Sequence, residues 1–231
     1  MNLLFDLPPA PTVPIAGSDT RFPVGRVFLV GRNYEDHAKE MGAAVDREAP
    51  VWFSKFASTV CVTPATIPYA PGTENYHYEM ELVVALGAGG FRVAPEDAMD
   101  LVTGYACGLD MTRRDLQSRM KSKQYPWDVA KNIENGAVIG PITPAAQFGE
   151  VSCQRIRLTQ NGTVKQDATL DLLIWSLPEL IADLSKLYHL QAGDLIYTGT
   201  PAGVGPVQPG DVLVGEVDGC EPIELRIAEA E

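Results

Sequence analysis

The chain has 231 residues, of which 45% are hydrophobic and 21% charged, as is usual for folded globular proteins. Its formal net charge of −12 argues against nucleic acids and anionic membranes as partners, because both attract basic surfaces. The scattered cysteines, the absence of a basic and apolar leader and the lack of a long apolar run predict a cytoplasmic protein with reduced thiols and no membrane span.

Residues 1–24 are rich in proline and show no periodicity, which predicts an extended arm that lies along the body or a partner subunit. Residues 25–231 contain no repeat, no low-complexity tract and no linker, so we expect one domain there. Short apolar runs bounded by glycine or proline predict the strands. These lie at 26–32, 51–56, 78–86, 103–112, 193–200, 210–217 and 222–228.

Helices are predicted at 33–41, 95–102, 113–123 and 177–190. The stretches 57–76 and 124–150 read as mostly irregular. Alternating residues on both sides of Asn161-Gly162 predict a β-hairpin with a type I′ turn, since both residues accept positive φ. Strands outnumber helices and do not alternate with them regularly, which indicates an α+β fold with a large mixed or antiparallel β-structure.

The predicted strand 78–86 carries acidic residues at alternate positions, Glu79 and Glu81. Side chains two residues apart point to the same face of a strand, so the two carboxylates stand side by side. The same face continues to Val83 and Ala85, so a face that begins charged ends apolar. The pair is either the solvated end of a strand or part of a site that binds a cation between like charges.

Asp110 could supply a third carboxylate, at the end of another predicted strand. Three carboxylates with water completing an octahedron suit Mg²⁺ or Mn²⁺, whereas zinc is disfavoured because no cysteine or histidine cluster is present. The alternative for Asp110 is a cap at the start of the following helix.

His37 and Glu40 lie three residues apart, on one face of a predicted helical turn. An imidazole oriented by a carboxylate is the usual composition of a general base for water. An exposed charge pair with no function would have the same spacing.

The glycine-rich stretch 199–205 lacks the lysine and hydroxyl residue of a nucleotide-binding loop. Its backbone N–H groups could approach a ligand carboxylate, or the stretch could be a plain tight turn. His189, near the end of a predicted helix, reads as structural or exposed.

In their order along the chain, these pieces resemble the fumarylacetoacetate hydrolase superfamily, from about residue 14 to the C-terminus. The resemblance is greatest to its small acylpyruvate hydrolases, including the bacterial fumarylpyruvate hydrolases of gentisate-type catabolism. The matching stretches are VGRNYEDHAKEMG, FSKF, HYEMELVVALG, GYACGLDMTRRDLQ, PWDVAK and GDLIYTGTPAGVGPV. The resemblance implies a β-rich catalytic domain over 25–231, a mixed β-sandwich roll with few helices, and a homodimer.

The resemblance also implies a role for each residue that matches the family's pattern. The implied metal ligands, for Mg²⁺ or Mn²⁺, are Glu79, Glu81 and Asp110. The implied catalytic residues are His37 and Glu40, which activate water, and Lys131 and Gln117, which hold the substrate and the developing oxyanion. The implied substrate-binding residues are Arg32, Arg114 and Thr200.

The implied reaction is metal-dependent hydrolysis of the carbon–carbon bond of a 3-acylpyruvate, with fumarylpyruvate as the expected substrate. Arg32, Arg113 or Arg114 would bind the distal carboxylate of the fumaryl group. Alternatives at the same site are decarboxylation of oxaloacetate, isomerisation or decarboxylation of a 2-oxo-diene-dioate, or binding of a 2-oxoacid without turnover. Two departures from the family's pattern, Tyr78 and the stretch 132–138, suggest a changed environment behind the metal and a reshaped pocket wall.

Overall fold

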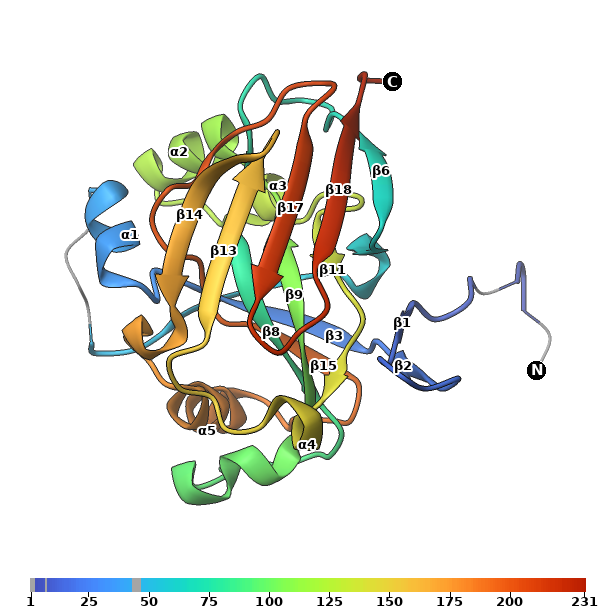
Figure 1. The fold of residues 1–231 in the computed structure, drawn as a ribbon, viewed down its shortest axis with the longest axis vertical. Helices are drawn as coiled ribbons and strands as arrows, with labels where there is room; N and C mark the ends of the chain where they lie inside the picture. The colour runs from blue at the N-terminus through green and yellow to red at the C-terminus, as the bar shows by residue number, and fades with distance from the viewer. Residues whose placement is uncertain (1–2, 7, 43–46) are drawn as a thin grey trace.

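The computed structural model describes residues 3–6, 8–42 and 47–231, and its ribbon is shown in Figure 1. Two larger β-sheets form the body. The eight-stranded sheet has the order β4-β3-β15-β8-β9-β11-β5, with β12 paired to β9, and the five-stranded sheet has the order β14-β13-β17-β18-β6. No helix among the described residues is long and apolar enough to cross a membrane.

The eight-stranded sheet is mixed, because β3 pairs in parallel with β15, and β5 in parallel with β11. Its strands are β3 (Arg26–Gly31), β4 (Val51–Lys55), β5 (Val60–Val62), β8 (Met80–Leu86), β9 (Val102–Asp110), β11 (Ala137–Ile139), β12 (Thr143–Pro144) and β15 (Asp194–Tyr197). The strands of the five-stranded sheet are β6 (Ala65–Pro68), β13 (Arg155–Gln160), β14 (Thr163–Thr169), β17 (Val212–Val217) and β18 (Ile223–Ala228).

The remaining strands form two small sheets: β1 (Thr12–Pro14) with β2 (Arg21–Pro23), and β7 (Tyr76–Tyr78) between β10 (Thr112–Arg113) and β16 (Gly205–Pro206). The helices are α1 (Glu35–Glu40), α2 (Arg114–Ser122), α3 (Asp128–Lys131), α4 (Ala145–Phe148) and α5 (Leu177–Leu187), with 3₁₀ turns η1 (Ala57–Thr59), η2 (Pro95–Leu101) and η3 (Leu170–Leu172). The predicted class, a β-rich α+β fold with few helices, is confirmed.

Strand β8 is buried on both of its faces, which explains its almost continuous apolar sequence. Met80, Leu82 and Val84 belong to the main core, which also includes buried residues of the five-stranded sheet. Val83 and Ala85 point the other way, into a second core that includes residues of β3 and β15. Glu81 has the parity of this second face, so its carboxylate stands at the edge of an apolar core.

The predicted hairpin is confirmed, with Asn161 at φ 52° and Gly162 at φ 77° between β13 and β14. The expectation of irregular structure at 57–76 is wrong, because β5 and β6 lie there. Each of these short strands pairs in parallel with a strand far along the chain, β11 and β18 respectively, so the local sequence gives little sign of them.

The other stretch expected to be irregular, 124–150, contains α3, β11, β12 and α4, each four residues or shorter. The predicted N-terminal arm contains the β1–β2 hairpin, whose Val13 and Phe22 side chains are buried in the second core. Burial of this kind ties the hairpin to the body of the chain.

Candidate metal and active site

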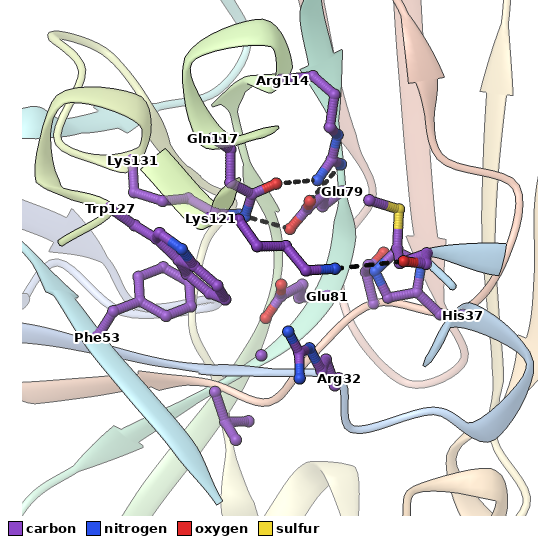
Figure 2. A pocket seen from close by; sticks show the side chains of 14 residues that line it. Arg32, His37, Phe53, Glu79, Glu81, Arg114, Gln117, Lys121, Trp127 and Lys131 are labelled. Carbon is purple, nitrogen blue, oxygen red and sulfur yellow. Dashed lines mark hydrogen bonds and ion pairs between the residues drawn. The ribbon is translucent and has the colours of Figure 1, made fainter. Parts of the chain in front are cut away.

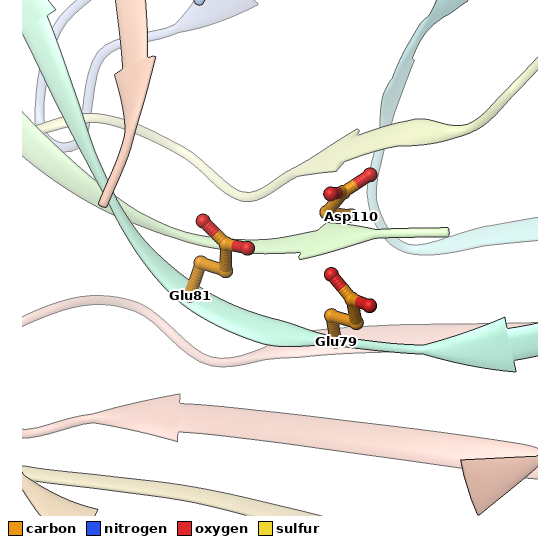
Figure 3. A group of neighbouring side chains, drawn as sticks. All are labelled: Glu79, Glu81 and Asp110. Atoms are coloured by element: carbon orange, nitrogen blue, oxygen red, sulfur yellow. The ribbon is translucent and has the colours of Figure 1, made fainter. Parts of the chain in front are cut away.

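Glu79, Glu81 and Asp110 meet where strands β8 and β9 pair (Figure 3). The register sets Met80 opposite Leu109, and the backbone N–H of Asp110 donates to the Glu79 carbonyl at 2.9 Å. One oxygen from each carboxylate lies within 4.8 Å of the others, and the three residues are at most 5% exposed. These residues therefore form a candidate metal site with oxygen ligands only.

Burial decides between the alternatives that the sequence left open. Glu79 and Glu81 are 5% and 1% exposed, so the solvated strand end is wrong. Helix α2 begins at Arg114 with Arg113 as its N-cap, so Asp110 does not cap it. Asp110 is instead fully buried at the end of β9 and forms ion pairs with two lysines.

Cations surround two of the three carboxylates. Lys131 Nζ lies 2.8 Å from Glu79 Oε2 and 2.5 Å from Asp110 Oδ2, and Arg114 Nη2 lies 2.5 Å from Glu79 Oε1. Lys55 Nζ lies 2.9 Å from Asp110 Oδ1. Burial alone would raise the pKa of Glu79, but Lys131 and Arg114 outweigh burial and lower it.

Glu81 lacks such a cation among the described residues. Its Oε2 accepts the Gly199 backbone N–H at 2.7 Å, while burial, and then Asp110 and Glu79, raise its pKa well above the usual value. Asp110 Oδ1 accepts no hydrogen bond from the described residues beyond its ion pair with Lys55. An uncompensated buried carboxylate in an oxygen-only donor set is what a hard divalent cation fits.

The His37–Glu40 pair forms on α1, with His37 Nδ1 3.1 Å from Glu40 Oε2. His37 is 5% exposed, so the pair is not the exposed charge pair that the spacing alone also allowed. An ionised carboxylate can only accept, so Nδ1 carries the proton and leaves Nε2 able to accept one. The pair thus has the composition and tautomer of a general base.

The glycine-rich stretch 199–205 connects the two sets of residues. Gly199 donates to Glu81, and the Gly203 N–H lies 3.2 Å from Glu40 Oε1. Both glycines have left-handed φ values, 97° and 98°, and a Cβ at Gly203 would lie 2.0 Å from the Lys165 carbonyl oxygen. The carboxylates that these backbone N–H groups contact belong to the protein, so the stretch is more than a plain tight turn, while binding of a ligand carboxylate by it stays a prediction.

A cavity lies against these groups (Figure 2). Asp110 and Glu40 do not line it, but each contacts a residue that does, Lys131 and His37 respectively. The predicted residues that line it are Arg32, His37, Glu79, Glu81, Arg114, Gln117, Lys131 and Thr200. All ten predicted site residues are thus brought into or directly behind one cavity.

Most of the chain, residues 26–228, matches the family model described as fumarylacetoacetate (FAA) hydrolase C-terminal. The chain belongs to the fumarylacetoacetate hydrolase family. A fumarylpyruvate hydrolase of Ralstonia sp is 51% identical over 193 residues, which cover 83% of this chain and 100% of that protein. An oxaloacetate tautomerase of Escherichia coli (strain K12) is 40% identical over 201 residues, covering 86% and 90% respectively.

The fold of this chain is very similar to that of a solved structure from the same family. The crystal structure of the fumarylpyruvate hydrolase from Pseudomonas aeruginosa in complex with Mn²⁺ and pyruvate superposes with a TM-score of 0.95. The two sequences are 44% identical, and the match covers 99% of this chain and 100% of that one. The curled, β-rich fold of the fumarylacetoacetate hydrolase C-terminal domain is therefore the fold of this chain.

Two parts of the chain that were expected at the cavity do not line it. Arg113, one of the arginines considered for the distal carboxylate, does not line the cavity, and its Nη1 donates to the Val129 carbonyl. Stretch 132–138 supplies no cavity wall. It lies behind the metal site instead, where the Gly136 carbonyl accepts a hydrogen bond from Lys55 at 2.7 Å.

Sequence reasoning missed other residues of the site. Lys55, at the end of β4, is fully buried. It lies in FSKF, one of the stretches that carry the resemblance, but its local pattern is that of a lysine at an exposed strand end and no role was assigned to it. Phe53 and Trp127 line the cavity with rings 5.8 Å apart, and Lys131 Nζ lies 5.0 Å from the Phe53 centroid. Lys121 also lines the cavity, and its spacing of four residues from Gln117 was the available signal.

Proposed function

We propose that this chain hydrolyses the carbon–carbon bond of a 3-acylpyruvate, with fumarylpyruvate as substrate and fumarate and pyruvate as products. The observation that carries the proposal is a buried three-carboxylate site in the same cavity as a histidine oriented by a carboxylate. The similarity to the Ralstonia and Pseudomonas fumarylpyruvate hydrolases supports the choice of substrate.

Glu79, Glu81 and Asp110 would hold Mg²⁺ or Mn²⁺, whose positive charge would bind the carboxylate and 2-oxo oxygen of the substrate and stabilise the departing pyruvate enolate. Lys131, Lys55 and Arg114 keep the ligands in place, since each contacts at least one ligand carboxylate.

His37 would take a proton from a water molecule, and the oxygen of that water would attack the acyl carbonyl carbon. Glu40 orients the imidazole through Nδ1, and Gly203 holds Glu40 in turn. The electrons of the breaking carbon–carbon bond pass to the pyruvyl carbon as an enolate. Protonation of that carbon, by the proton His37 acquired or by solvent, gives pyruvate, so one water is consumed for each bond broken.

Gln117 is the better placed of the two predicted oxyanion donors. Its Oε1 accepts from Arg114 at 2.5 Å, which orients the amide and leaves its N–H groups for the substrate. Lys131 already donates to Glu79, Asp110 and Thr112, which uses all three of its N–H groups. We therefore assign Lys131 mainly an electrostatic role next to the developing charge.

The test is turnover by the purified chain with Mg²⁺ or Mn²⁺, followed by the loss of the ultraviolet absorbance of the acylpyruvate enol and by pyruvate release. Chelation with EDTA and the Glu79→Ala variant should each abolish turnover. If neither slows the reaction, the metal assignment is wrong.

A second candidate is proton transfer or decarboxylation on oxaloacetate at the same site, which the similarity to the Escherichia coli oxaloacetate tautomerase favours. Decarboxylation needs no activated water, so a His37→Ala variant would separate the reactions. If the variant loses acylpyruvate cleavage but retains oxaloacetate decarboxylation, the chain has both activities. If it also loses oxaloacetate tautomerisation, His37 is the group that transfers the proton in that reaction.

We further propose a homodimer in the cytoplasm. Phe56 and Val129 expose apolar side chains, at 69% and 52%, and would be covered by a partner. The four cysteines are all free thiols, as a reducing compartment favours. Sedimentation equilibrium of the wild type beside a Phe56→Ser variant tests the dimer, which should weaken in the variant.

A further inference from the structure

The cations at the metal end of the cavity are bound by the protein's own groups. Arg114 contacts Glu79 and Gln117, Lys131 contacts Glu79, and Lys55 lies against Asp110. None of them is free to recognise the far end of a substrate without giving up a buried ion pair, and breaking such a pair is costly.

Two other cations line the cavity without a carboxylate partner among the described residues, Arg32 and Lys121. Arg32 makes no hydrogen bond or ion pair with any of those residues. Its φ of 62° is left-handed, a conformation that glycine or asparagine would adopt more readily than arginine. A strained backbone that carries a long cation into a cavity is a sign of a functional side chain.

Lys121 lies in the last turn of α2 and reaches across the cavity toward the C-terminal end of α1 (Figure 2). Among the described residues, its one hydrogen-bond contact is with the Met41 carbonyl oxygen, 3.5 Å from Nζ, which is too long for a strong hydrogen bond. The ammonium group of Lys121 therefore retains donors for a ligand.

The helix spacing relates Lys121 to the reacting end of the substrate. Gln117 and Lys121 are four residues apart on α2, so they lie on the same face with Cβ atoms about 5–6 Å apart. A substrate whose acyl carbonyl oxygen accepts from the Gln117 amide would thus extend its acyl chain along α2 toward Lys121.

We propose that Lys121, together with Arg32, determines specificity by binding the distal carboxylate of a dicarboxylic acylpyruvate. The inference rests on the proposed function and deepens it. A carboxylate at the end of the acyl chain would exchange water for two charge-assisted contacts, while an acetyl group reaches neither cation. In an otherwise acidic protein, these two side chains supply the local positive charge that an anionic acyl chain needs.

The competing interpretation is that Lys121 only fastens α1 to α2 through the Met41 carbonyl. In that case its loss would affect every substrate alike, because α1 carries His37. Substrates that differ only in the distal carboxylate therefore separate the two interpretations.

The experiment compares kcat/KM for fumarylpyruvate and acetylpyruvate in the wild type, Lys121→Met, Lys121→Arg and Lys123→Met, all loaded with Mn²⁺. We expect Lys121→Met to lower the ratio of the two values by about 10- to 100-fold, as loss of a charge-assisted hydrogen bond does. Lys121→Arg should retain most of the preference. Lys123, an exposed lysine two residues further on, is the matched control and should leave both values unchanged.

Equal losses on both substrates in Lys121→Met, or no loss on either, would overturn the proposal. A binding measurement keeps it testable if the wild type cleaves neither acylpyruvate, a result that would count against the proposed function alone. Calorimetry should then show that 2-oxopimelate binds the Mn²⁺-loaded wild type more tightly than 2-oxoheptanoate, which lacks only the distal carboxylate. Lys121→Met should erase this preference, and an unchanged preference would refute the role of Lys121.

Discussion

The two ends of the cavity are built differently. At the metal end, Glu79, Glu81 and Asp110 come from paired strands, are at most 5% exposed, and are surrounded by ion pairs and hydrogen bonds. At the other end, Arg32 and Lys121 come from the residue after β3 and from the last turn of α2, and are not buried. Under the proposed function, the reaction centre would be fixed by the sheet, while substrate choice would depend on side chains that can change with little effect on the fold.

The largest expected effect is at the metal end. Glu81→Gln should lower kcat/KM by about 10³-fold or more, because the loss of a metal ligand removes several kcal/mol of transition-state stabilisation. The variant should still fold, since the amide can accept the Gly199 N–H and removes a charge that burial disfavours.

The measurements for Glu81→Gln are turnover with Mn²⁺ and the thermal unfolding midpoint without metal. Glu216→Gln, at an exposed position on β17, is the matched control. Activity above a tenth of the wild-type value would contradict the assignment of Glu81 as a ligand.

The next largest effect is expected at His37, where a substitution should remove the general base and leave metal binding intact. His37→Ala should lower kcat/KM for an acylpyruvate by about 10²- to 10⁴-fold, the usual contribution of a general base. Mn²⁺ affinity, measured by calorimetry, should stay near the wild-type value because His37 is not one of the three ligands. His189→Ala is the control, since His189 is exposed and stacks on Phe91. Normal turnover in His37→Ala would exclude this histidine as the base.

A substitution at the metal end should also lower the stability of the fold. Lys55→Met removes the cation paired with Asp110 Oδ1 and the ammonium donor to the Met111 and Gly136 carbonyl groups. We therefore expect the free energy of unfolding to fall by about 3–5 kcal/mol, because one partner of a buried ion pair is lost. Urea denaturation of metal-free protein measures the change. Lys39→Met, on the exposed surface of α1, should stay close to wild type. A loss below about 1 kcal/mol would show that the buried pair contributes little.

The smallest expected effect is at the glycine-rich loop 199–205, which contacts both the metal site and the His37–Glu40 pair. Gly203→Ala places a Cβ against the Lys165 carbonyl and strains a left-handed residue, so we expect a loss of about 1–3 kcal/mol in stability. Because Gly203 holds Glu40, kcat should fall as well while Mn²⁺ affinity is kept. Gly210→Ala, also left-handed but with open space around the new Cβ, is the control for backbone strain alone.

The sequence predicts the cluster of three carboxylates better than the groups that surround it. The alternation of Glu79 and Glu81 is a local pattern, and strand pairing needed only to bring Asp110 beside them. Lys55 could not be found in this way, because its burial depends on β4 packing near the carbonyl groups of Met111 and Gly136. Strands β5 and β6 were missed for a similar reason, since their partners lie far along the chain.

The central claim is that the three carboxylates hold the metal on which acylpyruvate cleavage depends. The most direct measurement is titration of chelator-treated protein with Mn²⁺ while fumarylpyruvate cleavage and metal binding are followed together. We predict that activity is absent at first, rises with bound Mn²⁺ and reaches its plateau at one ion per chain, with no recovery in Asp110→Ala. Full activity before any Mn²⁺ is added, or the same recovery in Asp110→Ala, would contradict the claim.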